Sequence, residues 1–558
     1  MISEKHKKIL FNAIAWVCIA LFCFSITPRT FQNDTYYTIK IGEYITQNGV
    51  GNLTEDPFSW HDLSYTFPHW LYDFLTYQAY GIAEFFGVYA LTVLLSMILG
   101  ILLYSTCVKI SKNNIVSFVV TLGSIYMLKS FVAARAQLAT YLLFIWQIYS
   151  IESYIETRKK RHLISLLIIP IIIANLHCAV YPFYYVLYLP YIAEFVLIWF
   201  IDLDITSRVI ILSNKIKQKL TKNEEKKAKY QAEIEKENGI KEKIAAKRDA
   251  LRKKPYKIQV EKNSAIKILI IVFLISCFAG LVTPLGTTPY TYLYKTMEGN
   301  TTENINEHQP LVLAQNNDFL IALVIFALVI VFTDTKIKLR DLFMLVGVFY
   351  LTLTSKRQVS IFVIMCAPIL CKLLESLLAK YDPKLTKKLM DIATNAFGTI
   401  IIVCLVLILS LKQYKPKIGD EFVSSHDYPV EAAEWIIDNL EFENLRLYNE
   451  YNYGSYLLFK GIPVFIDSRA DLYAPEFNSE TGDKNDGKDI FSDALNIAGL
   501  STFYENKFES YGVTHVMSYE NSKLSMLLEK DSNYKLLYED SRFKIFERLN
   551  AEVVNEGE

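Results

Sequence analysis

The sequence predicts a polytopic α-helical membrane protein of about eleven transmembrane helices, followed by a C-terminal extracytoplasmic α/β domain. Three observations support this fold class. Of the 558 residues, 52% are hydrophobic. Many apolar windows approach the roughly 20 residues needed to cross a hydrocarbon core of about 30 Å. The last 140 or so residues contain no such window, and the formal net charge of zero gives no indication of a nucleic-acid partner.

Eleven apolar segments carry the transmembrane prediction. The first follows the basic start "SEKHKK" and is not followed by an A-x-A-like cleavage site, so we interpret it as a retained helix rather than a signal peptide. The predicted spans are 9–26, 83–107, 115–129, 137–153, 163–176, 179–200, 266–283, 318–333, 340–354, 358–377 and 394–411. Several are short, and we expect these to lie among other helices.

Lysine and arginine predict the orientation, because they are enriched in cytoplasmic connections. With the N-terminus in the cytoplasm, the inner connections are the basic ones, among them "VKISKNN", "ETRKKRH", "TDTKIKLRD" and "AKYDPKLTKK". The outer connections include a first loop over 27–82 and a later loop over 284–317. We therefore predict a multi-pass protein of the plasma membrane, with a transmembrane domain over 1–412 and an extracytoplasmic domain over 413–558.

Charge is distributed unequally between the two sides. A cytoplasmic insert over 201–265 is basic, with 18 Lys+Arg against 8 Asp+Glu from Arg208 to Lys262. Its composition favours a solvated helical hairpin, and contact with anionic inner-leaflet lipid is the functional alternative. The C-terminal part is acidic, with 28 acids against 12 Lys+Arg from Ile418.

The C-terminal domain is predicted to mix helices and strands. "YPVEAAEWIIDNL" has the period of an amphipathic helix. "LRLYNEYNYGSYLLF", "IPVFID", "THVMSYE" and "FKIFERL" are rich in aromatic and β-branched residues and are predicted to be strands.

The first outer loop opens with the predicted helix "DTYYTIKIGEYITQNG", which has a helical apolar stripe and a stop signal at Gly49. Asp34 lies near its start, where an N-cap and a chemical role are both open. Asp56 precedes Pro57 and also fits a turn. His69 lies near the membrane edge, where a structural role competes with a functional one.

Cations on the predicted outer face break the usual charge pattern. Arg135 lies in "AARAQ", and Lys356 and Arg357 lie in "TSKRQ". Such cations either extend to lipid headgroups or mark a substrate path, and they suit contact with phosphate. His177, Glu307 and His308 complete this polar set. Acids and cations together fit transfer chemistry on an anionic, lipid-attached substrate, in which an acid takes the acceptor's proton and cations hold the departing phosphate.

The order of these pieces resembles the GT-C superfamily of membrane glycosyltransferases, especially a bacterial group distantly similar to oligosaccharyltransferase and protein O-mannosyltransferase. The matching pieces are "DTYYTIKIGEYITQNG", "DPFSW", "HWL", "ARAQ", "NLH", "TPLG" with "NEHQP", "KRQ" and "YNYGSYLLFKGIPVFIDSRADLY". The resemblance implies transfer of a sugar from a polyprenyl-phosphate or polyprenyl-diphosphate donor, with inversion, to a glycan, lipid or protein acceptor of the cell envelope.

The resemblance also implies roles for individual residues. Asp34 is the expected catalytic base, and Asp56 is a second candidate. The expected phosphate and donor ligands are Arg135, Lys356, Arg357 and His177. The expected acceptor-binding or gating residues are His69, Glu307, His308, Asn452, Asp467 and Arg469. Asp34, Asp56 and Glu307 are candidate oxygen ligands for Mg²⁺ or Mn²⁺.

Several departures keep other interpretations open. Asn33 stands where related enzymes carry a second acid, and the second outer loop has no acidic pair. "EYNYG" replaces the "WWDYG" motif of oligosaccharyltransferase, so peptide recognition is not carried over. Asp467 and Arg469 also fit a structural salt bridge. The alternatives to an enzyme are a non-catalytic scaffold or lipid-carrier binder of the same fold, and a transporter.

Overall fold

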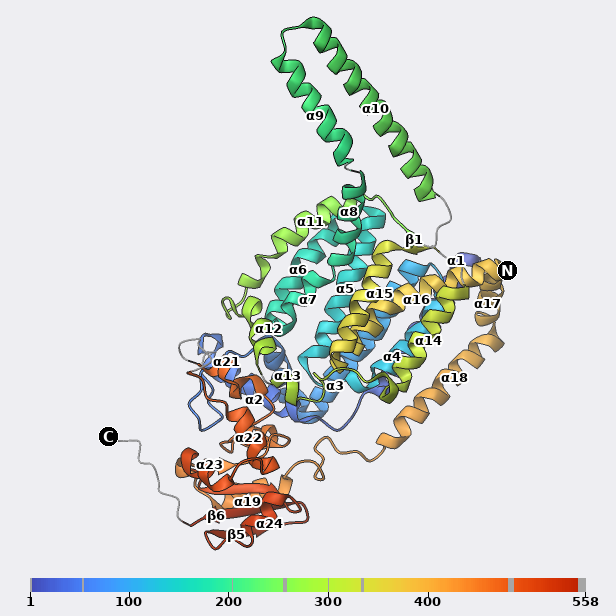
Figure 1. Ribbon diagram of the computed structural model, residues 1–558. Coiled ribbons are helices and arrows are strands. Elements are labelled where there is room, and N and C mark those ends of the chain that lie inside the picture. The colour runs from blue at the N-terminus through green and yellow to red at the C-terminus, as the bar shows by residue number, and fades with distance from the viewer. Residues whose placement is uncertain are drawn as a thin grey trace.

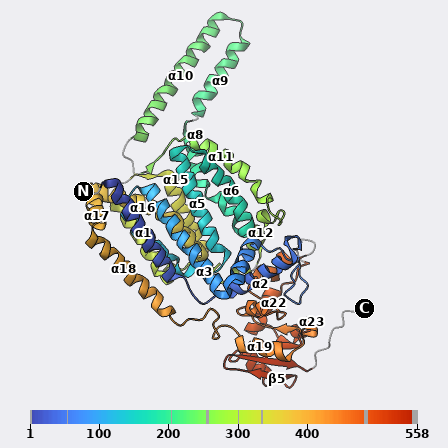
Figure 2. The ribbon, with the colours of Figure 1, turned by 180° about the vertical axis from the view of Figure 1, so that it is seen from behind.

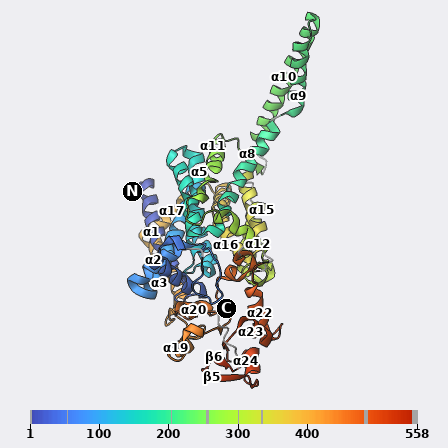
Figure 3. The same ribbon diagram turned by 90° about the vertical axis from the view of Figure 1, so that its left-hand side faces the viewer.

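A bundle of apolar helices forms the body of the protein (Figure 1). The computed structural model describes residues 3–52, 55–202, 204–253, 258–299, 301–332, 336–479 and 486–549. A small mixed domain lies at one end of the bundle, and a long helical hairpin projects from the other end (Figures 2 and 3).

Every predicted span falls on a helix or a pair of helices. These are α1 (Glu4–Ile26), α3 (Trp70–Ser111), α4 (Asn114–Leu128), α5 (Ala136–Thr157), α6 (Lys160–Leu176), α7 (Tyr181–Val186) with α8 (Leu189–Asp202), α11 (Ala265–Ser276), α14 (Asn317–Phe332), α15 (Leu339–Thr354), α16 (Val359–Tyr381) and α18 (Ala396–Tyr414). Within the described ranges, 6 helical stretches are long and apolar enough to cross a membrane. The protein is thus a helical membrane protein, and the count of eleven spans remains a prediction.

The predicted first outer loop contains the predicted helix, α2 (Asn33–Asn48), which ends at Gly49 with φ 77°. It packs on α3, and Gly42 allows a close approach, because a Cβ atom there would lie 2.2 Å from the carbonyl oxygen of Asp73. Helix α3 leaves helical geometry at Ala83 and Glu84. The predicted start of the second span at residue 83 coincides with this break, and the turns before it belong to the first loop.

The insert forms the predicted hairpin from α9 (Ile205–Leu220) and α10 (Glu224–Lys253). Short elements complete the bundle: β1 (Ile258–Gln259) pairs in parallel with β2 (Ile337–Lys338). The remaining helices are α12 (Thr288–Glu298), α13 (Thr301–Asn304) and α17 (Leu385–Ala393).

The C-terminal domain is built on a four-stranded sheet of order β3-β4-β6-β5. Its strands are β3 (Leu447–Tyr448), β4 (His515–Tyr519), β5 (Tyr534–Glu539) and β6 (Phe543–Arg548). Strand β3 is parallel to β4, and the other neighbouring pairs are antiparallel. Its helices are α19 (Val430–Asn439), α20 (Gly454–Phe459), α21 (Pro475–Asn478), α22 (Ile490–Gly499), α23 (Tyr504–Tyr511) and α24 (Lys523–Leu528).

Two of the four strand predictions are wrong, and two are confirmed as β4 and β6. "LRLYNEYNYGSYLLF" contains only the two residues of β3 and then turns into helix α20, and "IPVFID" contributes a single bridge from Val464 to Ser59. The predicted helix "YPVEAAEWIIDNL" is confirmed as α19.

The first loop and the C-terminal domain share one hydrophobic core. The ring of Tyr36 on α2 is fully buried, and its centroid lies 4.8 Å from that of Tyr428 and 5.2 Å from that of Tyr456. The separate core of the bundle runs along α1, α3, α5 and α16. The start of α2 is therefore held at the junction of bundle and C-terminal domain.

Candidate functional site

Asp34 lies in the first turn of α2 but is not its N-cap. The cap residue is Gln32, and its side chain makes no capping hydrogen bond. The N-cap interpretation of Asp34 is therefore wrong, because the helix begins one residue earlier, at Asn33. The helix dipole still favours a carboxylate at this position.

The carboxylate of Asp34 forms an ion pair with Arg135. The Oδ2 atom of Asp34 lies 2.6 Å from Nη2 of Arg135, and Nη1 of Arg135 lies 3.3 Å from Oε1 of Glu307. Arg135 directly precedes α5, so its guanidinium extends from the end of a bundle helix toward the first loop. One guanidinium thus bridges two acids from different connections of the helical bundle.

These side chains line a cavity of about 1580 Å³ at the junction with the C-terminal domain. All five predicted outer connections contribute to its wall, and so does the domain after residue 413. The predicted site residues that line it are Asp34, His69, Arg135, His177, Glu307, His308, Lys356, Arg357, Asn452 and Arg469. The structure therefore brings together the predicted base, the predicted phosphate ligands and most of the predicted acceptor residues.

Lys356 and Arg357 are held by backbone contacts with the later outer loop. The amide of Arg357 donates to the carbonyl of Glu307 at 3.0 Å, and that of Lys356 donates to the carbonyl of Gln309 at 3.0 Å. The ammonium of Lys356 also donates to Oδ1 of Asn306 at 2.6 Å. These hydrogen bonds fix the backbone of the short connection that carries Lys356 and Arg357.

The cations set the charge of their neighbours. Burial opposes ionisation of Glu307, but the charges of Arg135 and Arg357 outweigh it and lower its pKa. Burial, assisted by the charge of Arg357, lowers the pKa of His308 to about 4. His308 is therefore neutral at pH 7, and Nη1 of Arg357 lies 3.5 Å from its Nε2.

The two other predicted histidines, His69 and His177, line the cavity and are held by neighbouring side chains. Nδ1 of His69 lies 2.7 Å from Oδ1 of Asp73, and its Nε2 lies 3.3 Å from the hydroxyl of Tyr37. Nδ1 of His177 lies 2.9 Å from the hydroxyl of Thr140. Burial, together with the charge of Arg357, lowers the pKa of His177 well below its ordinary value, so this ring is a neutral wall residue.

Asp56 and Asp467 are not among the residues that line the cavity. Oδ1 of Asp56 lies 2.5 Å from Nη1 of Arg469, and Oδ2 of Asp467 lies 2.7 Å from Nη2 of Arg469. All three side chains are buried. The prediction of Asp56 as a second candidate for the catalytic base is corrected, because its carboxylate is paired with Arg469 and joins the first loop to the C-terminal domain. Asp467 and Arg469 form the salt bridge that was the structural alternative to a role in acceptor binding.

The "EYNYG" segment forms the C-terminal wall of the cavity through Glu450, Tyr451 and Asn452. The turn is fixed by Gly454, where a Cβ atom would lie 1.9 Å from the carbonyl oxygen of Ile466. Asn33 donates from Nδ2 to the carbonyl of Tyr451 at 3.0 Å. The residue that replaces a second acid therefore ties α2 to this wall.

Three acids that line the cavity, Glu303, Glu450 and Asp471, were missed as site residues, although the last two lie in segments that the sequence singled out. Burial raises the pKa of Glu450 to about 7. Burial also raises the pKa of Asp471, which accepts a hydrogen bond of 2.8 Å from the hydroxyl of Tyr292. The sequence could have indicated these two acids as site residues, because Glu450 lies within "EYNYG" and Asp471 within "FIDSRADLY".

The predicted metal ligands do not fit a divalent ion. Asp56 lies outside the cavity wall, and Arg135 occupies the space between the carboxylates of Asp34 and Glu307. Within the described ranges, no group of three or more His, Cys, Asp or Glu side chains is arranged to hold a metal. We therefore derive no step that uses Mg²⁺ or Mn²⁺.

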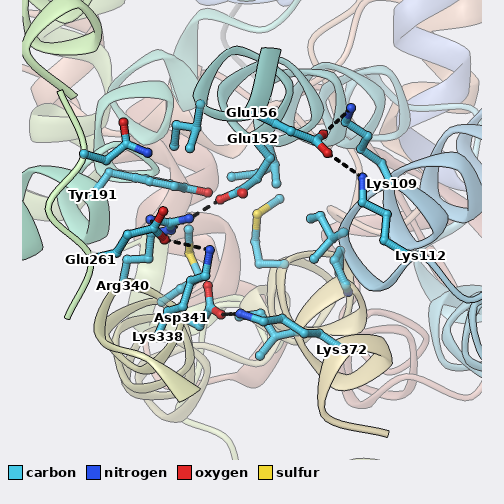
Figure 4. A pocket seen from close by; sticks show the side chains of 18 residues that line it. Lys109, Lys112, Glu152, Glu156, Tyr191, Glu261, Lys338, Arg340, Asp341 and Lys372 are labelled. Atoms are coloured by element: carbon cyan, nitrogen blue, oxygen red, sulfur yellow. Dashed lines mark hydrogen bonds and ion pairs between the residues drawn. The ribbon is translucent and has the colours of Figure 1, made fainter. Parts of the chain in front are cut away.

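A second cavity of about 260 Å³ lies at the other end of α5 (Figure 4). Five cations and four acids line it, and they pair with one another: Lys112 with Glu156 at 2.8 Å, Lys338 with Glu261 at 2.7 Å, and Lys372 with Asp341 at 2.7 Å. Arg340 is buried among Glu152, Glu194 and Glu261. Because these charges compensate one another, we assign the candidate site to the larger cavity.

The helical bundle, the helix after the first span and the mixed domain over a shared cavity make up a fold that is also found among solved structures. The chain is similar to the archaeal oligosaccharyltransferase AglB from Archaeoglobus fulgidus in complex with an inhibitory peptide and a dolichol-phosphate. This likeness has a TM-score of 0.53 and 12% identity over 96% of this chain and 74% of AglB. The apo form of the Archaeoglobus fulgidus oligosaccharyltransferase gives a TM-score of 0.52 and 11% identity over 93% of this chain and 70% of that chain. No protein-family model matches the sequence, and no curated protein matches it.

Proposed function

We propose that the protein is a membrane glycosyltransferase that transfers a sugar from a polyprenyl-phosphate or polyprenyl-diphosphate donor to a cell-envelope acceptor on the outer face. The observation that carries this proposal is the convergence of Asp34, Arg135 and Arg357 on one cavity. Its volume of about 1580 Å³ exceeds the roughly 300–1,000 Å³ of typical small-molecule sites, which suits a donor and an acceptor bound together.

In the proposed reaction, the acceptor oxygen attacks the anomeric carbon of the sugar as the bond from that carbon to the phosphate oxygen breaks. The acceptor attacks from the face opposite the phosphate, so the configuration inverts, and the electron pair of the broken bond leaves with the phosphate. Asp34 takes the acceptor's proton, and Arg135, Lys356 and Arg357 stabilise the negative charge on the leaving polyprenyl phosphate.

The ion pair between Asp34 and Arg135 gives the donor a role in activating the base. A donor phosphate competes with the Asp34 carboxylate for the guanidinium, because a guanidinium binds both groups in the same bidentate way. Once Arg135 has turned to the phosphate, Asp34 is free to accept a proton. Donor binding would then precede productive acceptor binding.

The C-terminal wall is the proposed acceptor side. Asn452 is exposed beside the half-buried Glu450 and Tyr451, so this wall offers an amide, a carboxyl group and a phenol ring. The similar AglB structure contains both a dolichol-phosphate and a peptide, which supports a fold that accommodates a lipid-linked donor and an acceptor together.

The test is radiolabel transfer from a panel of polyprenyl-linked sugars by the purified full-length protein. We expect wild type to transfer at least one sugar and Asp34→Asn to lose transfer by about 10²–10⁴-fold, the contribution of a general base. Asp438→Asn, an exposed acid of α19, is the matched control and is expected to keep full activity. Wild-type transfer by a folded Asp34→Asn variant would overturn the assignment of the base.

A non-catalytic lipid-carrier binder of the same fold is the second candidate. The ion pair between Asp34 and Arg135 favours it, because the guanidinium occupies the carboxylate that would have to accept the proton. This alternative predicts that the protein binds polyprenyl phosphate and that no sugar is transferred from any donor of the panel.

A further inference from the structure

Helix α9 carries an apolar stripe that the protein leaves uncovered. Val209, Leu212, Ile216 and Leu220 recur three or four residues apart and therefore lie on one helix face. They are between 49% and 79% exposed. We call these four residues the α9 stripe, and along the helix they span about 16 Å at 1.5 Å per residue.

The opposite face of α9 packs against α10 and is largely polar. Ser207 and Asn214 are buried there, and the amide of Gln218 is 3.2 Å from the amide oxygen of Gln231. The side-chain nitrogen of Asn214 makes no hydrogen bond within the described part of the chain. An isolated amphipathic hairpin normally buries its apolar faces. Here polar side chains are buried and apolar ones exposed, which is typical of a surface that a partner covers.

The charges around the α9 stripe indicate the chemistry of that partner. From Ile205 to Leu220 the helix contains no acid, and its four cations are Arg208, Lys215, Lys217 and Lys219. On a helical projection, Lys217 lies on one side of the stripe and the other three lie on the opposite side. A second copy of α9 would bring like charges together, which is unfavourable. Acidic side chains on both borders of an apolar face would complement this surface.

The position of the hairpin favours a soluble partner over a lipid surface. It projects from the end of the bundle that lies away from the C-terminal domain (Figures 1 and 3). The α9 stripe runs along a helix that leads away from the bundle, so a bilayer around the bundle would reach only its base. Contact with anionic lipid, the alternative suggested by the sequence, would leave most of the stripe exposed.

We propose that the α9 stripe is a docking site for an acidic amphipathic helix of another protein on the side of the membrane where the hairpin lies. The apolar face of that helix packs on Leu212, Ile216 and Leu220, which form a ridge of four-residue spacing. Its acids pair with the lysines on both borders. This inference does not depend on the proposed glycosyl transfer.

Photo-crosslinking in native membranes tests the docking site in the full-length protein. A photoreactive residue is placed at Leu212 or at Ile216, and at Lys236, exposed on α10, as the control. We expect both stripe positions to give a crosslink that mass spectrometry maps to an acidic amphipathic helix of another protein, and we expect none from Lys236. Adducts with lipid alone, with a second copy of the chain, or with no molecule would each overturn the proposal.

A charge-reversal variant tests the acidic character of the partner. Lys215→Glu combined with Lys217→Glu and Lys219→Glu should lower the crosslink yield at Leu212 by about tenfold, the sum of three exposed ion pairs. The matched control reverses Lys226, Lys227 and Lys229 of α10 and should leave the yield unchanged.

The charge-reversal variant can be compared with its control only if the hairpin of α9 and α10 remains folded in both. A photoreactive residue at Gln218 reports its integrity, because that side chain contacts Gln231 of α10 and should crosslink within the chain in every variant. If the charge-reversal variant keeps both the internal crosslink and the full crosslink yield at Leu212, the proposal that the partner is acidic is wrong.

Discussion

The carboxylate of Asp34 and the guanidinium of Arg135 lie 2.6 Å apart, so the proposed base and a proposed phosphate ligand neutralise each other before any substrate binds. The side chains are 16% and 25% exposed, and water therefore reaches the pair. An anionic phosphate has to displace one member of this pair, which makes the two residues respond oppositely to substitution.

Substitution of Arg135 and substitution of Asp34 should change the affinity for the donor in opposite directions. Arg135→Ala should weaken binding of polyprenyl phosphate by about 10- to 150-fold, since hydrogen bonds to charged groups contribute about 1.5–3 kcal/mol. Asp34→Asn should tighten it, because the guanidinium loses its competitor. Equilibrium binding of a fluorescent polyprenyl phosphate measures both effects. Arg161→Ala, on α6 near its start, is the control, and weaker binding by Asp34→Asn would contradict the exchange of ion partners.

Loss of the central cation of the buried ion cluster should destabilise the fold strongly. Arg469→Met leaves Asp56 and Asp467 buried without their partner, and breaking such a pair costs about 3–5 kcal/mol. Thermal and denaturant unfolding in detergent provide the measurement. Lys460→Met breaks an exposed pair with Glu434 at 3.7 Å and should cost at most about 1 kcal/mol. Equal losses of unfolding free energy in Arg469→Met and Lys460→Met would show that the buried ion cluster contributes little to stability.

A side chain at Gly454 should disturb the acceptor wall. A Cβ atom there would lie 1.9 Å from the carbonyl oxygen of Ile466 and 2.7 Å from Nδ2 of Asn449. Gly454→Ala therefore has to move the turn that holds Glu450 to Asn452, with an overpacking cost of about 1–3 kcal/mol. Unfolding measurements and acceptor KM report the two consequences. Gly347→Ala, which meets no heavy atom within 4 Å, should change neither.

Glu450 should make stability fall with rising pH. Burial raises its pKa from 4.5 to about 7, so between these values the unfolded chain has lost a proton that the folded protein retains. Stability therefore decreases as the pH rises through this window, by up to about 1.4 kcal/mol per pH unit. Glu450→Gln should remove this slope, and Glu431→Gln, exposed on α19, should keep it. Parallel pH profiles for wild type and Glu450→Gln would refute the prediction.

Local patterns in the sequence were sufficient for the apolar helices of the bundle and for α2 and α19. The stripe of Tyr37, Ile41 and Ile45 and the stop at Gly49 predicted α2, because a helical period and a left-handed glycine are local properties. The convergence of Arg135 and Arg357 followed from their placement on one predicted face of the membrane domain.

The sheet and the buried ion cluster of Asp56, Asp467 and Arg469 were harder to predict from the sequence than the apolar helices. "YNYGSYLLF" is short, apolar and aromatic, and such runs fit a strand or a buried helix equally well. Strand β5 was missed because it is an edge strand with charged, exposed positions rather than a clear alternation. The pairing of Asp56 with Arg469 joins positions 413 residues apart, and no local pattern contains that information.

The contact between Asp56 and Arg469 also imposes an order on biosynthesis. The first loop is made long before the arginine that neutralises its buried acid, and at about 5–20 residues per second the interval is roughly 20 to 80 seconds. During that interval the loop lacks its ionic partner and the aromatic core formed with Tyr428 and Tyr456. The first loop of the nascent protein therefore cannot complete its ionic and aromatic contacts until the segment from Tyr428 to Arg469 has been made.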